Sequence, residues 1–190
     1  MTSKCNPYIC GANACKTSCT ASTDCVSPDI CAGGGCVPPV TLTVQLAERD
    51  TFTGDAAVAP HFSIKNSGTN PVALSSITVR YWYTEEGTVA QTASCDYAMI
   101  SCSNITLSLV PVSPAVTGAN YYFQFGFTTA AGTLAAGAST TDIQLRFSKN
   151  DFTNYNETDD YSYLSTTAYT TTAKVTAYLN GTLIYGTEPK

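Results

Sequence analysis

Cysteines are concentrated near the start of this 190-residue chain, and their chemistry allows two interpretations. Seven of the nine cysteines fall within residues 5–36, a segment with few aliphatic residues. So short a segment cannot bury enough apolar surface to fold unaided, so its cysteines must either form disulfides or bind zinc. No CxxC pair or nearby histidine gives the usual zinc spacing. We therefore favour disulfides, which indicate an oxidising compartment and a secreted protein.

Groups that could perform acid–base or nucleophilic catalysis are scarce. His61 is the only histidine, and it begins an alternating segment, which indicates a structural role. The carboxylates Glu85-Glu86 and Asp159-Asp160 are neighbours in sequence, whereas a glycosidase needs two carboxylates roughly 5–10 Å apart across a cleft. Neither a Gly-x-Ser-x-Gly nor an HExxH motif is present. The chain is predicted not to be an enzyme.

The elements that must position these groups begin after the cysteine-rich segment. The glycine run of residues 32–35 reads as a flexible turn, and Pro38-Pro39 reads as a stiff extended linker. This change in composition predicts two parts. Residues 1–39 form a cysteine-rich disulfide module with its linker, and residues 40–190 form a second domain.

Short segments of alternating apolar and polar residues fill the second domain, which is typical of strands with one buried face. The clearest lie at residues 41–46, 61–65, 77–83, 121–127, 143–147 and 175–185. Asn180-Gly181 supplies a type I′ turn within the last of them, and no segment has a sustained helical period. The pattern predicts an all-β fold, an antiparallel sandwich or jelly roll.

Charge and hydropathy restrict the partners. Charged residues make up only 12% of the chain and the formal net charge is −5, which argues against nucleic acid or an anionic membrane surface. No apolar stretch is long enough to span a membrane, and residues 1–4 do not lead into a signal peptide, so we expect a fragment of a longer secreted protein. Abundant Thr, Ser, Asn and Tyr suit contact with a neutral polar surface such as carbohydrate.

Several sequence blocks occur in an order that carries a resemblance. Residues 61–84 read HFSIKNSGTNPVALSSITVRYWYT, and residues 145–163 read LRFSKNDFTNYNETDDYSY. AYLNG follows at 177–181, and GTEP at 186–189. Over about residues 41–190 the chain resembles family 3 carbohydrate-binding modules, the cellulose-binding domains of bacterial cellulases and scaffoldins. The resemblance implies a jelly-roll sandwich of about nine strands, a structural calcium, a cellulose-binding strip and a catalytic domain elsewhere in the parent protein.

The cysteine-rich segment has a separate resemblance. Its cysteine spacing, together with Lys16-Thr17-Ser18-Cys19, is similar to that of short repeats in secreted myxobacterial proteins. This likeness is limited to the module of residues 1–39. It agrees with the extracellular location that the disulfides indicate.

The resemblance implies that Thr84, Glu86, Asn156, Asp159 and Asp160 bind Ca²⁺. Calcium takes six to eight oxygen ligands from carboxylates and carbonyls, so two distant loops that converge on it are held together. Glu86 stands where the family usually has aspartate, and its longer side chain puts its part in binding in doubt. The alternative is that Asp159 and Asp160 only cap a polar turn.

The resemblance also implies a flat binding strip composed of Asp96, Tyr97, Gln144, Arg146 and Phe152. The two rings would stack on the apolar faces of sugars, while Arg146, oriented by Asp96, and Gln144 would hydrogen-bond hydroxyl groups. Tyr97 replaces the usual histidine, Phe152 replaces the usual tryptophan, and a further tyrosine expected soon after Tyr97 has no counterpart. These departures leave open weaker binding or a shift to another β-glucan or chitin.

Two cysteines flank this loop. Cys95 and Cys102 are seven positions apart and bracket Asp96 and Tyr97, so we expect a disulfide that stiffens the loop. Two functions remain open. The first is binding of cellulose or a related insoluble β-glucan. The alternative is a structural or protein-interaction module, such as a surface or filament subunit, that keeps the sandwich and has lost glycan binding.

Overall fold

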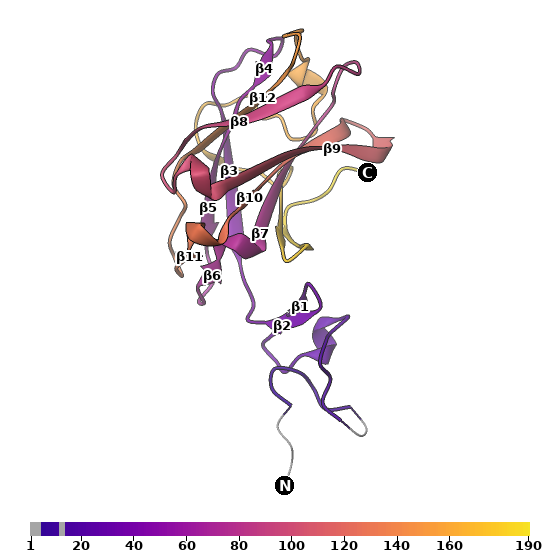
Figure 1. Cartoon of the computed structure of the whole chain (residues 1–190), viewed down its shortest axis with the longest axis vertical. Coiled ribbons are helices and arrows are strands. Elements are labelled where there is room, and N and C mark those ends of the chain that lie inside the picture. Colours follow the sequence, from indigo (N-terminus) through magenta and orange to yellow (C-terminus); the bar gives the residue numbers. More distant parts are fainter. Residues whose placement is uncertain (1–4, 12–13) are drawn as a thin grey trace.

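The computed structural model describes residues 5–11 and 14–190. Residues 1–4, on which the expectation about a signal peptide rests, lie outside the described residues. The described residues form fifteen strands, of which eleven build two facing sheets and the others form two small pairs. Figure 1 shows the sandwich above a smaller N-terminal part, which we call the head (residues 5–37). The all-β sandwich prediction is confirmed.

The first sheet is built around β12, which has neighbours on both edges. Its strands are β3 (Leu42–Glu48), β4 (Ala57–Val58), β5 (Pro60–Asn66), β8 (Gln91–Ala98), β12 (Ile143–Lys149) and β13 (Thr170–Thr171). β4 and β5 flank one edge of β12, β8 flanks the other, and the sheet continues through β3 to β13. All the pairings are antiparallel.

The second sheet has the strand order β15-β14-β7-β10-β9. Its strands are β7 (Ile77–Tyr83), β9 (Ile105–Val116), β10 (Ala119–Phe127), β14 (Thr176–Leu179) and β15 (Thr182–Tyr185). A separate pair of β6 (Val72–Ala73) and β11 (Thr133–Leu134) lies beyond the sheets. The bounds of β7 agree with the predicted alternation, whereas β8 and β9 were not predicted.

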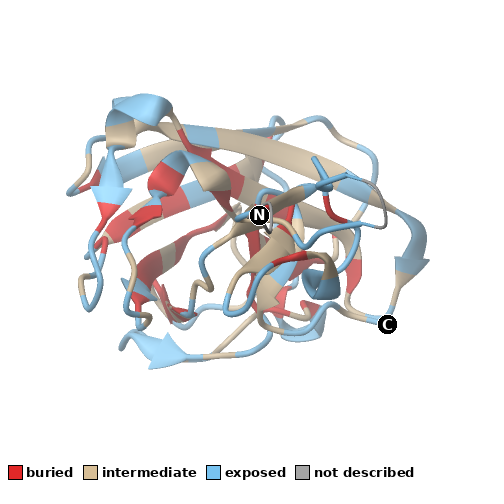
Figure 2. Cartoon of the chain, turned by 90° about the horizontal axis from the view of Figure 1, so that it is seen from below, coloured by how far each residue is buried: buried red, intermediate tan, exposed pale blue. Residues whose placement is uncertain are grey.

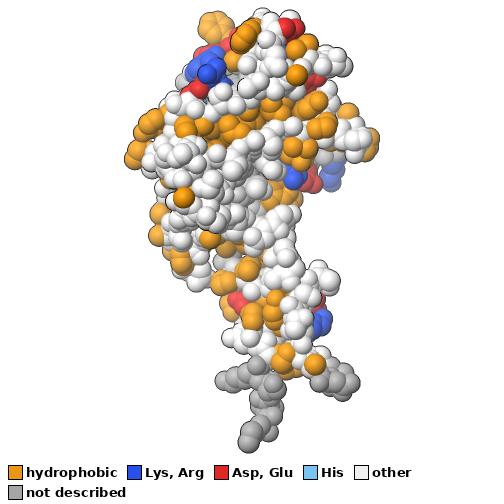
Figure 3. All heavy atoms as spheres, viewed as in Figure 1, with side chains coloured by type: hydrophobic (Ala, Val, Ile, Leu, Met, Phe, Trp, Pro, Cys, Tyr) orange, Lys and Arg blue, Asp and Glu red, His pale blue; other side chains and the backbone are white. Residues whose placement is uncertain are grey.

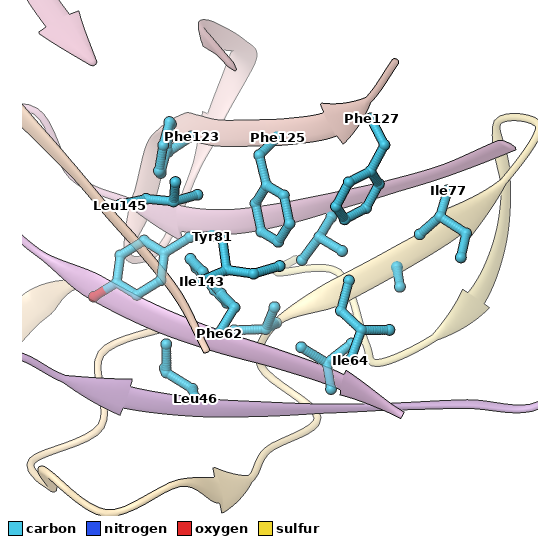
Figure 4. Close-up of a cluster of buried hydrophobic side chains, with 14 of the residues drawn as sticks. Leu46, Phe62, Ile64, Ile77, Tyr81, Phe123, Phe125, Phe127, Ile143 and Leu145 are labelled. Atoms are coloured by element: carbon cyan, nitrogen blue, oxygen red, sulfur yellow. The ribbon is translucent and has the colours of Figure 1, made fainter. Parts of the chain in front are cut away.

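The core lies between the two sheets and is rich in aromatic side chains. Figure 4 shows Phe123 and Phe125 of the second sheet facing Phe62 and Leu145 of the first. Phe62, Phe123, Phe125 and Leu145 are fully buried, and the ring centroids of Phe62 and Phe125 are 4.8 Å apart. Burying one such side chain contributes about 1.5–3 kcal/mol. In Figure 2 the buried segments lie along the strands, and the loops are mostly exposed.

Short 3₁₀ turns are the only helical elements of the described residues, namely η1 (Ser22–Asp24), η2 (Leu74–Ser76), η3 (Cys102–Asn104), η4 (Thr129–Ala131) and η5 (Glu157–Asp159). None of them has the length or apolar character needed to cross a membrane.

Three disulfides hold the head together, in agreement with the disulfide interpretation. They join Cys5 to Cys15, Cys19 to Cys31 and Cys25 to Cys36. The hairpin of β1 (Ile30–Ala32) and β2 (Gly35–Val37) completes the head.

The glycine run forms a turn between the two strands of the head, as the sequence predicted. Gly33 and Gly34 both have positive φ, as the tight turn between β1 and β2 requires. The turn rests on the sandwich, because the Gly33 N–H donates to Thr182 Oγ1 and Ala32 belongs to the buried core. A Cβ on Gly33 would lie 2.6 Å from the Cβ of Asn180, so only glycine allows this contact. The head is therefore docked on the β14–β15 turn.

Gly33→Ala should release the head from the sandwich, and Gly34→Ala provides a matched control. Both positions have positive φ, but a Cβ on Gly34 would meet no atom within 4 Å. The cost of a left-handed alanine, about 1–2 kcal/mol, is therefore common to both variants. We expect limited proteolysis to cut residues 37–41 faster in Gly33→Ala than in Gly34→Ala. Equal cleavage rates would show that the contact does not hold the head.

Candidate functional site

Strand β12 fixes which polar side chains reach the outer face of the first sheet. Ile143, Leu145 and Phe147 are fully buried against the second sheet. Because side chains alternate along a strand, Gln144 and Arg146 must point to the opposite, outer face. Arg146 is exposed and Gln144 is half-buried. The core thus determines the direction of both predicted polar residues.

Pairing with β8 brings the other predicted polar group to this face. Gln144 lies opposite Tyr97, but Leu145 lies opposite Cys95, so Asp96 is the extra residue of a β-bulge. The Arg146 Nε donates to Asp96 Oδ1 at 2.7 Å. An exposed ion pair of this kind contributes under about 1 kcal/mol to stability, so its main effect is to orient the guanidinium group.

Two aromatic rings are presented to solvent beside these polar groups. Tyr97 is 45% exposed and Phe152 is 69% exposed. Phe152 lies in the turn after β12, where its N–H donates to the carbonyl of Lys149. Its φ of 57° is a left-handed conformation that a bulky residue adopts only at a cost, and such outliers occur often at ligand sites. We call Asp96, Tyr97, Gln144, Arg146 and Phe152 the strip.

A disulfide closes the loop that carries Asp96 and Tyr97. Cys95 is joined to Cys102, and their Cα atoms are 5.6 Å apart. Just beyond the loop, the Asn104 Nδ2 donates to the carbonyl of Ile100 within it. The loop is therefore held both covalently and by its own hydrogen bonds, which fixes the Tyr97 end of the strip.

Hydrogen bonds connect Gln144 to two residues that the sequence analysis did not identify, Asp142 and Tyr169. Asp142 accepts a hydrogen bond from Gln144 Nε2 at 2.6 Å, and its other carboxylate oxygen accepts one from the Tyr169 hydroxyl. His61 lies opposite Gln144 on β5, and burial lowers the pKa of its imidazole, so it is neutral at pH 7. Tyr169 precedes β13, which has only two residues. A strand this short shows no alternating pattern in the sequence, so Tyr169 could not be placed from it.

The predicted metal ligands divide into two contacts. The Thr84 N–H donates to Asp160 Oδ1 at 2.7 Å, and the Asn156 N–H donates to Glu86 Oε1 at 2.8 Å. The Asn156 side chain caps η5. Asp159 is exposed, and its side chain takes no part in either contact as the structure places it.

Glu86 has a second partner that competes with a metal ion. Its Oε2 lies 3.4 Å from the ammonium group of Lys149, which is almost fully buried over the ring of Tyr155. Lys149 also donates to the carbonyl of Asn154. The longer glutamate side chain is thus already partly neutralised by a lysine.

Asp160 is the unusual member of the group. It is 6% exposed, and its Oδ2 has no hydrogen-bond partner among the described residues. Burial, opposed by the Thr84 hydrogen bond and reinforced by the charge of Glu157, raises the pKa of Asp160 to about 9. No three acidic side chains of the described residues bring carboxylate oxygens within 4.8 Å of one another. A cation here would need backbone and hydroxyl oxygens as well.

Further acidic side chains are buried nearby, and the sequence analysis did not predict their burial. Burial raises the pKa values of Glu48 and Glu157 to about 8. For Glu48, the negative charge of Glu157 contributes to the increase. Both line a polar cavity of about 10 Å³, where Arg49 pairs with Asp50 and Asp55. The interior at this end of the sandwich is therefore short of positive charge.

Known proteins share the sandwich. Residues 43–186 match a family model described as cellulose binding domain. The chain is 42% identical over 149 residues to the β-mannanase/endoglucanase A of Caldicellulosiruptor saccharolyticus, covering 78% of this chain and 11% of that protein. It is 42% identical over 170 residues to exoglucanase-2 of Thermoclostridium stercorarium, covering 85% of this chain and 18% of that protein. The chain thus spans less than a fifth of either relative.

Solved structures agree with these matches. The CBM3b module of the scaffoldin subunit ScaA from Acetivibrio cellulolyticus has a TM-score of 0.75 and 41% identity, over 78% of this chain and 97% of that one. The family 3a module of the cipA scaffolding of Clostridium thermocellum has a TM-score of 0.71 and 35% identity, over 77% of this chain and 100% of that one. The family match begins at residue 43, so the head lies outside it.

The buried acids predict how stability depends on pH in metal-free buffer. The pKa of Asp160 in the folded chain, about 9, lies above the ordinary aspartate pKa of 3.8. The folded state therefore keeps a proton that the unfolded chain loses, so stability should fall as the pH rises from about 4 to 9. Asp160→Asn, which stays neutral, should make the slope shallower. Urea titrations across this range measure it, and an unchanged slope in the variant would contradict the burial argument.

Proposed function

The chain belongs to the family of cellulose binding domains, and on that premise we propose that it binds cellulose or a related insoluble β-glucan through the strip. Members of this family are carbohydrate-binding modules, which are not catalytic, so the chain is a binding module rather than an enzyme. The observation that carries the proposal is the outer face of β8 and β12. There the Asp96–Arg146 pair and the exposed Tyr97 belong to the paired strands, and the exposed Phe152 follows the end of β12.

The chemistry of this face suits a neutral polysaccharide. Sugar rings present apolar C–H faces, so stacking on Tyr97 and Phe152 removes apolar surface from water. Arg146, oriented by Asp96, then donates to sugar hydroxyl groups, and Gln144, oriented by Asp142, forms hydrogen bonds with them as well. Figure 3 shows only a few separate groups of Lys and Arg side chains on the face in view, in keeping with a chain of which 12% of the residues are charged.

The relatives support a larger setting for the module. They include an endoglucanase, an exoglucanase and a cellulosomal-scaffolding protein, each much longer than this chain. We place the module in a secreted protein that carries a catalytic domain and is brought to its substrate by the strip. Four disulfides and the likeness of the head to repeats of secreted myxobacterial proteins support an extracellular location.

A structural Ca²⁺ held by Thr84, Glu86, Asn156, Asp159 and Asp160 is the second part of the proposal. The unpartnered Oδ2 of Asp160 and the repulsion among nearby carboxylates support it, because a cation would remove both costs. The donors are all oxygens, as calcium prefers. Glu86 would be the weakest ligand because Lys149 already neutralises it. When bound, the ion would supply positive charge that joins the two loops.

Calcium should raise the melting temperature of the chain, because a ligand that binds only the folded state stabilises it by mass action. We expect EDTA to lower the melting temperature, and added CaCl₂ to restore it. Asp160→Asn should abolish the response, while Asp29→Asn, the same change at an acidic residue of the head outside the proposed site, should keep it. A wild-type melting curve indifferent to EDTA in calcium-stripped buffer would leave Asp159 and Asp160 as a polar turn.

Phe152→Ala should weaken binding to microcrystalline cellulose by about 1–3 kcal/mol, by analogy with removing a ring stacked on a base. Phe152→Trp should strengthen binding, because the larger ring covers more of the sugar. Leu183→Ala, which truncates an exposed apolar side chain on the second sheet, is the control. Adsorption isotherms measure the three variants, and high salt should change them little.

The same isotherms decide between the two functions. If wild-type chain stays in solution with cellulose and chitin alike, the strip has lost its function. The structural or interaction module would then be the better account.

A further inference from the structure

A small polar cavity lies at the end of the sandwich away from the head. β4, whose Ala57 lines the cavity, is at that end in Figure 1. The cavity has a volume of about 10 Å³, which is room for about one water molecule or one ion of similar size. Its charged lining consists of four carboxylates and one guanidinium group, from Glu48, Asp50, Asp55, Glu157 and Arg49. The cavity is therefore both small and acidic.

The guanidinium group of Arg49 is already paired with two of these carboxylates. Its Nε lies 3.0 Å from Asp50 Oδ2, and its Nη2 lies 3.0 Å from Asp55 Oδ2. The second oxygen of each aspartate accepts a hydrogen bond from a backbone N–H. Both aspartates are thus fully partnered. Glu48 and Glu157, by contrast, form no salt bridge within the described part of the chain.

Glu48 occupies a core-facing position at the end of β3. The inward side chains of this strand include Leu42, Val44 and Leu46, and alternation places Glu48 on the same face. Glu48 is only 3% exposed. The Tyr81 hydroxyl donates to its Oε1 at 3.5 Å, but its Oε2 has no hydrogen-bond partner among the described residues. A buried carboxylate oxygen is thus left without a partner in a residue that lines the cavity.

Glu157 reaches the same cavity from a distant segment of the chain. It begins η5, it is 4% exposed, and its N–H donates to the carbonyl of Thr53 at 2.9 Å. The Tyr155 N–H donates to the carbonyl of Asp55 at 2.8 Å, so two hydrogen bonds hold this segment against the β3–β4 loop. The negative charges of Glu157 and Glu48 are close enough to repel each other. Two buried carboxylates therefore share one cavity.

The size and donors of the cavity indicate what could neutralise these carboxylates. A buried charge is costly unless it is paired, and a water molecule would supply hydrogen bonds but no charge. Ca²⁺ takes six to eight oxygen ligands, and Mg²⁺ keeps several of its waters. A cavity with room for about one water suits neither ion, because no three acidic side chains of the described residues bring carboxylate oxygens within 4.8 Å of one another. A monovalent cation, which is less strongly hydrated, fits better.

We propose that this cavity binds one small monovalent cation, Na⁺ or K⁺, between the carboxylates of Glu48 and Glu157. The two ligands are not among the side chains of the proposed calcium site, and the inference does not depend on glycan binding. The bound ion would join the end of β3 to η5, in addition to the backbone hydrogen bonds between these segments. The folded chain should therefore be more stable when such a cation is present.

Melting temperatures in three chloride salts at one ionic strength test the site. NaCl, KCl and choline chloride screen surface charges equally, but choline is too large for a cavity of about 10 Å³. The CaCl₂ concentration is the same throughout, so the state of the proposed calcium site does not change. We expect the wild-type chain to melt about 2–4 °C higher in NaCl or KCl than in choline chloride. The salt with the larger increase identifies the preferred ion.

Glu48→Gln and Glu157→Gln keep the shape of each side chain and remove its charge. Each variant should lose the difference between the salts, while Asp29→Asn, an acidic residue of the head, should keep it. In choline chloride both glutamine variants should melt no lower than wild type, because removal of one carboxylate relieves the repulsion. A purely structural glutamate would give the opposite result in choline chloride. Either glutamine variant serves if the other does not fold.

Three results would overturn the inference. The first is a wild-type melting temperature that is the same in all three salts, as expected if the two glutamates keep a proton or hold only water. The second is a salt difference that persists in both glutamine variants, which would place the ion elsewhere on the chain. The third is a lower melting temperature of both variants than of wild type in choline chloride, which would make the two carboxylates structural.

Discussion

The alternation of β12 between a buried and an exposed face is the constraint on which the site depends. The ring centroid of Phe147 lies 4.4 Å from that of Tyr83 and 5.2 Å from that of Phe123. The inward face of the strand is therefore packed against the second sheet. A slip of one residue would bury Arg146 and expose Phe147, which would cost more than any surface contact returns. The aromatic core therefore sets the register, and the register sets the direction of every outward group on β12.

Two regions of the sandwich that depend on this register differ in their interactions. The outer face has weak contacts held in fixed positions, such as the Asp96–Arg146 pair at the β-bulge and the loop closed by Cys95–Cys102. The end of the sandwich near η5 has the opposite character, because strong but uncompensated charges are buried there around Asp160. Lys149 joins the two regions. It is the last residue of β12, it pairs with Glu86, and its carbonyl holds the turn that presents Phe152.

The sequence predicted what periodicity and resemblance could carry. The strand at Ile77–Tyr83 was predicted with its bounds, because its apolar residues alternate. β8 was missed because its small polar residues show no such pattern. β9 was missed as well; it contains Pro111 and Pro114, which are rare in strands but are tolerated in an edge strand. The strip residues came from resemblance alone, and Asp142 and Tyr169 were beyond reach because only the fold brings residues 27 positions apart together. The glycine turn was predicted, but its close approach to Asn180 was not, because only the fold brings these distant positions together.

The most direct test of the account is hydroxyl-radical footprinting of the chain adsorbed on microcrystalline cellulose, read by mass spectrometry. Tyr97 and Phe152 project from the first sheet, and Leu183 is a comparably exposed side chain on the second. The account predicts that oxidation of Tyr97 and Phe152 falls on adsorption, while oxidation of Leu183 stays at the level of the free chain. Unchanged oxidation of both rings in adsorbed protein, or protection of Leu183 instead, would contradict the claim that the outer face of β8 and β12 binds the polysaccharide.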